Sequence, residues 1–427
     1  MFSPAVAARA RSIRTRPWPP FRAALAIAAG LGFGAPLPAQ EAAPAEPSSR
    51  AEILLKQRQE KQKNLEPYTI SKWEQRLLKS EKRPLAQKLF VKGFQGFRAV
   101  IGGMPSGSGF VFGAGYLYGL NSDQFQFTAN ARRSTRGYTT FDALAEFPTR
   151  LSDLPIRAHL LAQYQDLTAL SFYGLGGDSS RERRSFFQME DRRLSGGLTY
   201  RPGHRFEIGA QAGLLNVNIG SGSRRPSFET VFDPSATPGV GEQPEFWVSG
   251  GQVGFNLHDQ EFRPAGVSFE LGLQRYDGRD SDAHDFTRVS GEIQAHIPLG
   301  YRNRIFALRL RSSHSSGDAD AEVPFYLMET IGGARTLRGF NEYRFRDRRN
   351  LLINAEYRWE VWNYLDFGVF ADAGKVFSDS GDFGFSNLQA GYGVGARIHT
   401  PTGTTLRFDL ARSNEGIKLH ISGGPRF

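Results

Sequence analysis

Residues 351–361 read LLINAEYRWEV and residues 364–377 read YLDFGVFADAGKVF, and these two stretches are the clearest indication of the fold. Apolar and aromatic residues such as Tyr357 alternate there with polar ones such as Glu356 and Asp372. Successive side chains of a β-strand point to opposite faces, so each stretch predicts a strand with one apolar face and one charged face. The fold therefore depends on whether the apolar face of each strand packs in a protein core or faces lipid.

The same alternation recurs through most of the chain, as in GFVFGAGYLYG (109–119), QFQFTANA (124–131), TLRFDLAR (405–412) and GIKLHI (416–421). A water-soluble sandwich would bury the apolar faces, whereas a membrane barrel turns them to lipid and turns the charged faces to its lumen. Long strands, recurring Pro-Gly turn signals and an export signal favour the barrel. The expected fold class is all-β, a transmembrane antiparallel β-barrel.

The amino-acid composition excludes or disfavours other classes of protein. The 427 residues include 48 glycines, 34 phenylalanines and no cysteine. Mean hydropathy is −0.41, and no apolar stretch reaches the roughly 18 residues of a membrane helix, which excludes a helical membrane protein. A chain without thiols tolerates an oxidising periplasm. The net charge of +10 could indicate nucleic acid, but basic residues at the N-terminus explain it better, so no nucleic-acid partner is expected.

The N-terminus has the pattern of a secretory signal. Five arginines precede the apolar run AALAIAAGLGFGA (23–35), which is too short to span a bilayer as a helix. We expect residues 1–39 to be a signal peptide cleaved after Ala39. Residues 40–89 are rich in charge, alanine and proline, and we expect a periplasmic linker with short helices or disorder.

Residues 90–427 are expected to form the barrel domain. At about 21 residues per strand with its turn, this length gives about 16 strands, within a range of 14 to 18, and single-chain barrels favour even numbers. Two long stretches lack alternation, at 220–245 and 316–343, and both are rich in glycine, proline and charge. We expect them to be extracellular loops, because barrels of this architecture carry their long loops on that side.

The second of these loops contains IGGARTLRGF (331–340). Its Leu337-Arg338-Gly339-Phe340 resembles the loop motif of the BamA/TamA family of outer-membrane barrels, also called the bacterial surface antigen family. Further along, Phe370-Ala371-Asp372-Ala373-Gly374 resembles the family's motif on the thirteenth strand, the position at which our strand count also places it. The terminal Phe427 resembles the end of the family's C-terminal assembly signal.

The two motifs suggest a contact. Asp372 lies on the lumen face of its strand, and an arginine such as Arg338 can hold a carboxylate with two parallel hydrogen bonds. Glu356, on the lumen face of the preceding strand, is a second candidate acceptor, and Gly339 permits close approach of the loop backbone. The alternative is that Arg338, with Arg335, Arg344, Arg346, Arg348 and Arg349, is one of six loop arginines that face solvent.

The chain also departs from the resemblance. Family members that insert or translocate proteins carry periplasmic POTRA modules, and the segment between Ala39 and Phe90 is shorter than one module and helical in character. We therefore expect no POTRA domain here, which puts substrate capture in doubt. Gly423-Gly424-Pro425 interrupts the last strand, and proline weakens pairing, so these residues mark a strand end or a weak seam.

Other kinds of site are not favoured. The sequence contains no zincin motif, no Walker A motif, no nucleophile elbow and no cysteine, so no enzyme, catalytic residue or cofactor is expected. The eight histidines have no ligand spacing, so no metal site is expected. GYGVGA (391–396) reads better as strand glycines than as a dinucleotide site. The arginine runs 181–184 and 344–349 read as solvated loop charge, or as contacts for lipopolysaccharide phosphates.

Three functions remain open. The first is the one that the resemblance implies, assembly or translocation of a protein or lipid client at the outer membrane. The second is a passive pore or structural barrel, and the third, an enzyme, has no supporting motif. The expected partners are the lipid bilayer, lipopolysaccharide, an unidentified client and a periplasmic protein bound through residues 41–88. The expected location is the outer membrane of a diderm bacterium.

Overall fold

The computed structural model describes part of the chain, and every structural statement below concerns that part. The described residues are Lys72, Gln75, 94–105, 107–119, 125–147, 155–240, 243–257, 265–300, 303–318, 321–362, 364–400 and 403–422. The expected signal peptide (1–39), nearly all of the expected linker (40–89), the sequence Gly423-Gly424-Pro425 and the terminal Phe427 lie outside the described residues.

The described chain is almost entirely β-structure. Its strands are β1 (Phe97–Ile101), β2 (Val111–Tyr118), β3 (Gln126–Ser134), β4 (Thr139–Phe147), β5 (Ile156–Phe172), β6 (Ser185–Tyr200), β7 (Phe206–Ser221), β8 (Glu245–Asn256), β9 (Gly266–Gly278), β10 (Phe286–Pro298), β11 (Arg304–Gly317), β12 (Glu329–Ile331), β13 (Phe345–Asp347), β14 (Arg349–Trp362), β15 (Leu365–Phe377), β16 (Gln389–Thr400), β17 (Gly403–Ser413) and β18 (Gly416–Ser422). Short 3-10 helices occur only in connections, as η2 (Arg181–Arg183), η3 (Phe228–Thr230), η4 (Pro234–Ala236), η5 (Asp282–His284), η6 (Phe325–Leu327) and η7 (Ser380–Asp382).

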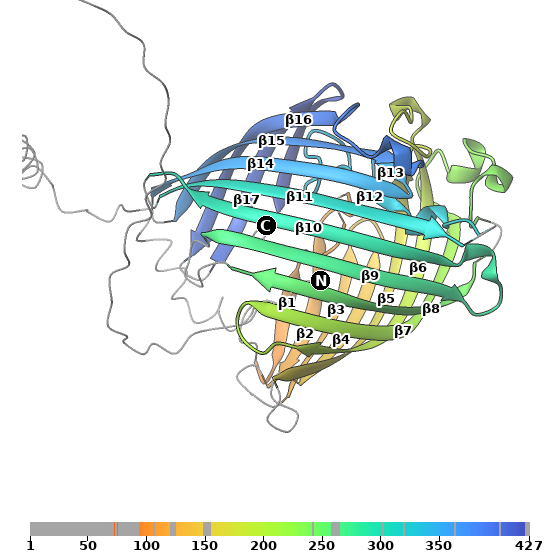
Figure 1. Ribbon diagram of the computed structural model, residues 1–427, viewed down its shortest axis with the longest axis horizontal. Coiled ribbons are helices and arrows are strands. Elements are labelled where there is room, and N and C mark those ends of the chain that lie inside the picture. The colour runs from red at the N-terminus through yellow and green to blue at the C-terminus, as the bar shows by residue number, and fades with distance from the viewer. Residues whose placement is uncertain are drawn as a thin grey trace, which may run out of the picture. The chain divides into compact units, whose positions relative to one another are not determined.

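Sixteen strands form one antiparallel sheet that curls into a barrel (Figure 1). Each strand pairs with its neighbours in the chain, except that β11 pairs with β14 because β12 and β13 form a separate two-stranded sheet. The predicted fold class and the count of about 16 strands are confirmed. In this order β15 is the thirteenth strand, as the sequence predicted, and β1 and β18 are the first and last.

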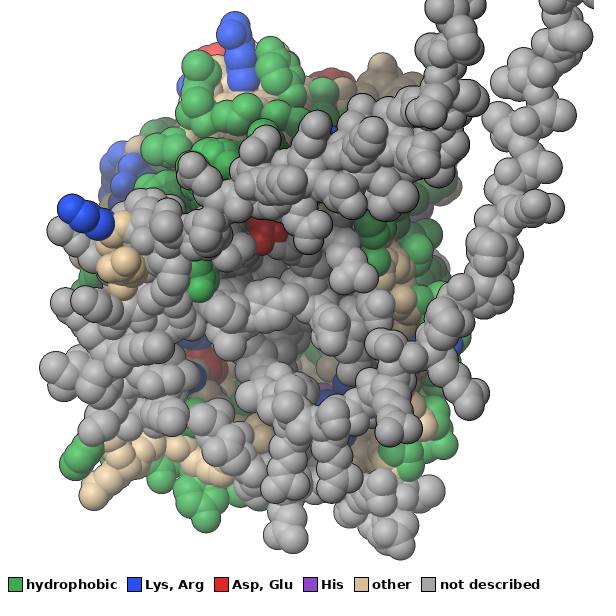
Figure 2. Space-filling model, turned by 90° about the vertical axis from the view of Figure 1, so that its left-hand side faces the viewer, with side chains coloured by type: hydrophobic (Ala, Val, Ile, Leu, Met, Phe, Trp, Pro, Cys, Tyr) green, Lys and Arg blue, Asp and Glu red, His purple; other side chains and the backbone are tan. Residues whose placement is uncertain are grey.

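The two faces of the sheet have opposite chemistry. Phe367 and Val369 of β15 are 45% and 53% exposed on the outside, whereas Asp372 on the other face is 1% exposed. The same alternation puts large apolar side chains of most strands on the outer wall, as a bilayer requires. Figure 2, which looks at the left-hand end of Figure 1, shows hydrophobic side chains around the rim and acidic and basic ones between them, towards the middle.

Strand lengths differ from the sequence estimate. We expected every strand to reach the about 9–11 residues that span a bilayer at a tilt. In the described part, β1, β2 and β18 have 5, 8 and 7 residues, whereas β5 has 17. The strands at the two ends of the sheet are therefore shorter than those in the middle, and the expected minimum length was wrong for these three strands.

The longer connections lie at one end of the barrel, which we call the loop end. The connections that contain η2, η3 and η4 lie together at the right-hand end of Figure 1. The predicted loops at 220–245 and 316–343 correspond to the connection from β7 to β8 and the connection from β11 to β14. The latter is the sixth connection at the loop end, and we call it the sixth loop.

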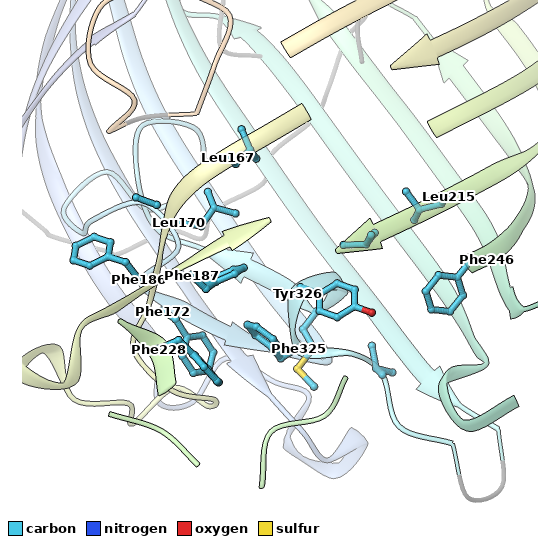
Figure 3. Close-up of a cluster of buried hydrophobic side chains, with 14 of the residues drawn as sticks. Leu167, Leu170, Phe172, Phe186, Phe187, Leu215, Phe228, Phe246, Phe325 and Tyr326 are labelled. Carbon is cyan, nitrogen blue, oxygen red and sulfur yellow. The ribbon is translucent and has the colours of Figure 1, made fainter. Parts of the chain in front are cut away.

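A buried aromatic cluster occupies the loop end of the barrel interior (Figure 3). Its centre is Phe325 of the sixth loop, whose ring centroid lies 5.2, 5.0 and 5.3 Å from those of Phe172, Phe187 and Phe228. These side chains come from β5, β6 and η3. We call the whole group of buried residues around Phe325 the aromatic cluster. It joins loops to strands at the loop end through apolar packing.

Candidate functional site in the sixth loop

Arg338 of the sixth loop has the largest fully buried side chain of the described chain, with an exposed fraction of 0%. Its Nε donates to Oδ2 of Asp372 at 2.7 Å, and its Nη2 donates to Oδ1 at 2.8 Å. The backbone N–H of Arg338 also donates to Oδ2 at 3.2 Å. Two parallel bonds from the planar guanidinium fix direction as well as distance. The loop is thereby held against the inner face of β15.

Two further carboxylates face the same guanidinium. Nη1 of Arg338 donates to Oε2 of Glu356 on β14 at 3.0 Å and lies 3.7 Å from Oδ2 of Asp409 on β17. Both carboxylate side chains are almost fully buried, at 1% and 3% exposure. A single arginine therefore interacts with three strands of the wall. We call Arg338, Asp372, Glu356 and Asp409 the Arg338 network.

Other cations balance these carboxylates. Glu356 also accepts from Arg358 at 3.2 Å and from Arg407 at 3.3 Å, and it is paired with Arg397. Arg407 in turn lies 2.7 Å from Asp409. In the low dielectric of a buried site an unpaired carboxylate would be strongly destabilising. The surrounding arginines supply cationic partners to the acidic groups inside the barrel.

Asn354 and Phe370 position the Arg338–Asp372 pair. Asn354 of β14 donates from Nδ2 to Oδ1 of Asp372 at 2.7 Å and to the carbonyl of Thr336 at 2.9 Å. The guanidinium carbon of Arg338 lies 3.2 Å from the centroid of the Phe370 ring, a cation–π arrangement. The phenylalanine and the aspartate of the strand motif therefore contact the same arginine. Phe370 lies against the flat face of the guanidinium, and Asp372 binds its edge.

Gly339 brings the loop backbone against the strands. A Cβ added at Gly339 would lie 2.6 Å from Cβ of Ser413 and 3.1 Å from the carbonyl oxygen of Arg412 on β17. Ser413 donates from its hydroxyl to the carbonyl of Gly339 at 2.7 Å. His420 of β18 contacts the carbonyl of Arg338 at 2.8 Å through Nε2. The motif thus extends its contacts to the last two strands.

Leu337 and Phe340 anchor the motif on both sides. Both are 0% exposed and pack with Ile331, Phe345 and Val376 in a second buried cluster, and the Phe340 and Phe345 ring centroids are 5.2 Å apart. Gly374 of the strand motif faces this cluster: an added Cβ would lie 3.3 Å from Cδ1 of Ile331 and 2.9 Å from the carbonyl oxygen of Leu351. The apolar residues of the motif thus hold the loop in place while Arg338 interacts with the carboxylates.

The six loop arginines do not form one solvated group. Arg335 is exposed, but Arg344 and Arg346 are only 4% and 3% exposed, so the expectation of solvated charge was wrong for these two. Nε of Arg344 lies 2.6 Å from Oε1 of Glu415. Arg346 donates to the carbonyl of Phe325 at 2.7 Å and has no ion pair within the described chain. Burial lowers the pKa of Arg346 to about 10.

Sequence reasoning identified Arg338, Asp372 and Glu356 but missed Asn354, Asp409 and His420. Asn354 and Asp409 lie on the polar faces of alternating stretches, so inward direction was readable for both. Their closeness to Arg338 could not be predicted, because the loop that carries Arg338 has no periodicity from which its path follows. Within the described residues, no cluster of three or more potential metal ligands occurs, and no helix has the length and apolarity to cross a bilayer.

Comparison with known families identifies this architecture. Residues 126–424 match the Omp85 superfamily domain, which covers more than half of the 427 residues. The chain belongs to the Omp85 superfamily. Membership and fold together place this Omp85 chain in the outer membrane of a Gram-negative bacterium. No curated protein sequence matches the chain at a significant level.

Two solved structures share the fold. BamA from Haemophilus ducreyi lacking POTRA domains 1–3 aligns with a TM-score of 0.57 at 15% identity, over 77% of this chain and 69% of that one. CdiB from Escherichia coli aligns with a TM-score of 0.52 at 11% identity, over 76% of this chain and 61% of that one. The chain therefore spans less than two thirds of CdiB. At these identities the likeness shows the Omp85 barrel fold alone.

Proposed function

We propose that this Omp85 barrel inserts or translocates a client, a protein or a lipid, at the outer membrane, and that the sixth loop held by the Arg338 network takes part. Proteins of similar fold include BamA and CdiB. The observation that carries the proposal is the fully buried Arg338, which binds Asp372 with two side-chain hydrogen bonds and Glu356 with a third. A barrel that only lined a pore would not need a loop fixed at such depth.

The distribution of these contacts supports an active role for the last strands. The sixth loop contacts β14 and β15 through Glu356 and Asp372, β17 through Ser413, and β18 through His420. β18 is the last strand of the sheet order, and a short terminal strand is the place where a barrel wall opens most easily. The loop is thus positioned to control how firmly the end of the sheet is held.

The aromatic cluster favours this function over a passive pore. Phe172, Phe187, Phe228 and Phe325 are all 0–1% exposed and pack inside the loop end. A water-filled pore is lined by polar side chains. Apolar rings at that end are better suited to closing the interior from the cell surface while the other end receives a client.

The parts outside the described residues complete the proposal. Residues 1–39 would direct export as a signal peptide, and residues 41–88 would bind a periplasmic partner that presents the client. Phe427 would end the signal by which the barrel itself is assembled. Crosslinking in intact cells, followed by purification, tests the tail: deletion of residues 41–88 should remove the crosslinked partner while the barrel still folds.

The central test is substitution of Arg338. Arg338→Ala removes the arginine that holds the buried Asp372 with two side-chain hydrogen bonds, and one of the four arginines on Glu356, which is expected to destabilise the folded barrel by about 3–5 kcal/mol. Arg338→Lys should not restore activity, because an ammonium cannot form the planar pair of bonds. Arg335→Ala is the matched control, since Arg335 lies in the same loop but is exposed. Heat-modifiable gel migration reports folding, and crosslinking to a client reports activity.

Conductance separates the proposal from its alternative. The intact barrel in planar bilayers should conduct little, and Arg338→Ala should raise conductance by releasing the sixth loop. If the intact barrel conducts steadily, yields no crosslinked client and responds equally to Arg338→Ala and Arg335→Ala, it is a passive pore and the proposed function is wrong.

A further inference from the structure

The outer wall between β14 and β18 contains two adjoining hollows of about 470 and 360 Å³. Val369, Val394 and Leu410 line both of them, so the two form one continuous depression. The first hollow reaches Arg412, near the loop end of β17, and the second reaches Phe408, nearer the middle of that strand. We call the combined depression the outer groove.

The second hollow of the groove lies at one small residue among large ones. Ala396 of β16 is paired directly with Phe367 of β15 and with Phe408 of β17. Cross-strand neighbours on one face stand close together, so a methyl group between two rings leaves a depression. The neighbouring pair, Gly368 and Gly395, has no side chains on the inner face of the wall behind this hollow. This hollow is therefore a consequence of the sequence and register of these strands.

A cation stands at the loop end of the groove. Arg412 is exposed on the outer face of β17, in register with Tyr392 on one side and Ile417 on the other. Within the described part of the chain no carboxylate pairs with Arg412. Apart from Arg412, the outward side chains lining the groove are apolar or aromatic. An arginine at the edge of an apolar surface extends towards the interface, where it can bind an anionic group.

We propose that the outer groove binds one acyl chain of a phosphate-bearing glycolipid of the outer leaflet, lipid A, with a phosphate of its headgroup on Arg412. Guanidinium and phosphate match in charge and in geometry. From Arg412 to Phe408 the groove follows β17 for four residues, or roughly 13 Å, the length of an acyl segment rather than of a compact ligand. Arg412 lies at the loop end, which faces the cell exterior in barrels of this architecture, where this glycolipid forms the leaflet.

Backbone pairing disfavours a protein strand as occupant. The strands β15, β16 and β17 are each hydrogen-bonded to neighbours on both sides, so their backbone groups are not free to pair with an added strand. A ligand of the groove must therefore bind through side chains alone. A flexible hydrocarbon chain with one anionic group meets that requirement.

The test is native mass spectrometry of the full mature barrel after incubation with lipid A, with phosphatidylglycerol and phosphatidylcholine as separate probes. Arg412→Gln should weaken lipid A retention about tenfold, since a charge-assisted hydrogen bond to phosphate contributes about one decade or more of affinity. Ala396→Phe should reduce retention of the same lipid by filling the second hollow, which Ala396 lines, while Arg412 remains. Arg133→Gln is the matched control, because Arg133 is also an exposed arginine near the loop end of its strand, β3.

The outcomes separate cleanly once heat-modifiable migration shows that each variant folds. Loss of lipid A retention in both groove variants, with the control unchanged, supports the proposal. Equal retention of all three lipids, preference for phosphatidylglycerol, or equal loss in Arg133→Gln would overturn it. If Arg412→Gln does not fold, Ala396→Phe decides, because it leaves every charged group in place: unchanged retention overturns the proposal and reduced retention supports it. None of these results depends on client insertion.

Discussion

The carbonyl oxygen of Arg338 lies 2.8 Å from Nε2 of His420, so the loop motif is hydrogen-bonded to β18, the last strand of the sheet. The two residues are 82 positions apart in the chain. Because the carbonyl accepts, Nε2 carries the hydrogen and donates it. The side chain and the backbone N–H of the same arginine bind Asp372, and its side chain also binds Glu356, so it is the carbonyl that holds the terminal strand.

Replacing His420 should therefore loosen β18 without unfolding the barrel. His420→Ala removes one hydrogen bond, worth about 1 kcal/mol, and the effect should be confined to the last strand. Hydrogen exchange of the β18 amides should become several-fold faster, as measured by mass spectrometry. Lys418→Ala is the control, since Lys418 is on the same face of the same strand. Equal acceleration in both variants would contradict a specific role for the contact.

A methyl group at position 339 should disrupt the site. In Gly339→Ala the new Cβ would lie 2.6 Å from Cβ of Ser413, closer than side chains approach. Overpacking of this kind destabilises by about 1–3 kcal/mol. The urea midpoint of the folded barrel in detergent should fall accordingly. Gly203→Ala provides the comparison, because nothing lies within 4 Å of its added Cβ. A midpoint unchanged in both variants would show that the loop backbone can move away.

Removing the central ring should weaken the aromatic cluster. Phe325 is 0% exposed, so Phe325→Ala leaves a cavity and is expected to destabilise the loop end by about 3–5 kcal/mol. Limited proteolysis should then cleave the connection between β7 and β8 faster, since η3 packs on this ring through Phe228. Phe385→Ala, at a ring that is 69% exposed, should behave like the original chain. Unchanged cleavage in Phe325→Ala would mean that the loops are held by other contacts.

Two neighbouring arginines should respond in opposite ways to the same substitution. Arg346 is buried without an ion pair in the described chain, so Arg346→Met removes a desolvated charge and should leave the unfolding free energy equal or higher. Arg344→Met instead leaves Glu415 without its partner and should destabilise by about 3–5 kcal/mol. Thermal unfolding at neutral pH measures the difference. Similar losses in the two variants would count against the assignment of Arg346 as unpaired.

Much of the architecture could be predicted from the sequence, because strand periodicity is a local property of the backbone. Alternation in residues 351–361 and 364–377 predicted that Glu356 and Asp372 face inward, and both are 1% exposed on the inner face. Length and turn signals predicted about 16 strands, which the sheet contains. In these stretches each side chain's direction follows from its position relative to its neighbours, and no distant residue needs to be known.

The environment of the loop residues could not be read in this way. Arg335, Arg338 and Arg346 are the same residue type in one loop, yet the first is exposed and the other two are buried. Periodicity says nothing about a chain without regular dihedral angles, so its path depends on packing against strands far away in the sequence. Alternation along the chain is enough to predict the barrel and the inward carboxylates. The contacts of Arg338 with Asp409 and His420 follow from the three-dimensional fold, because they require the loop to enter the lumen and the last strands to lie beside it.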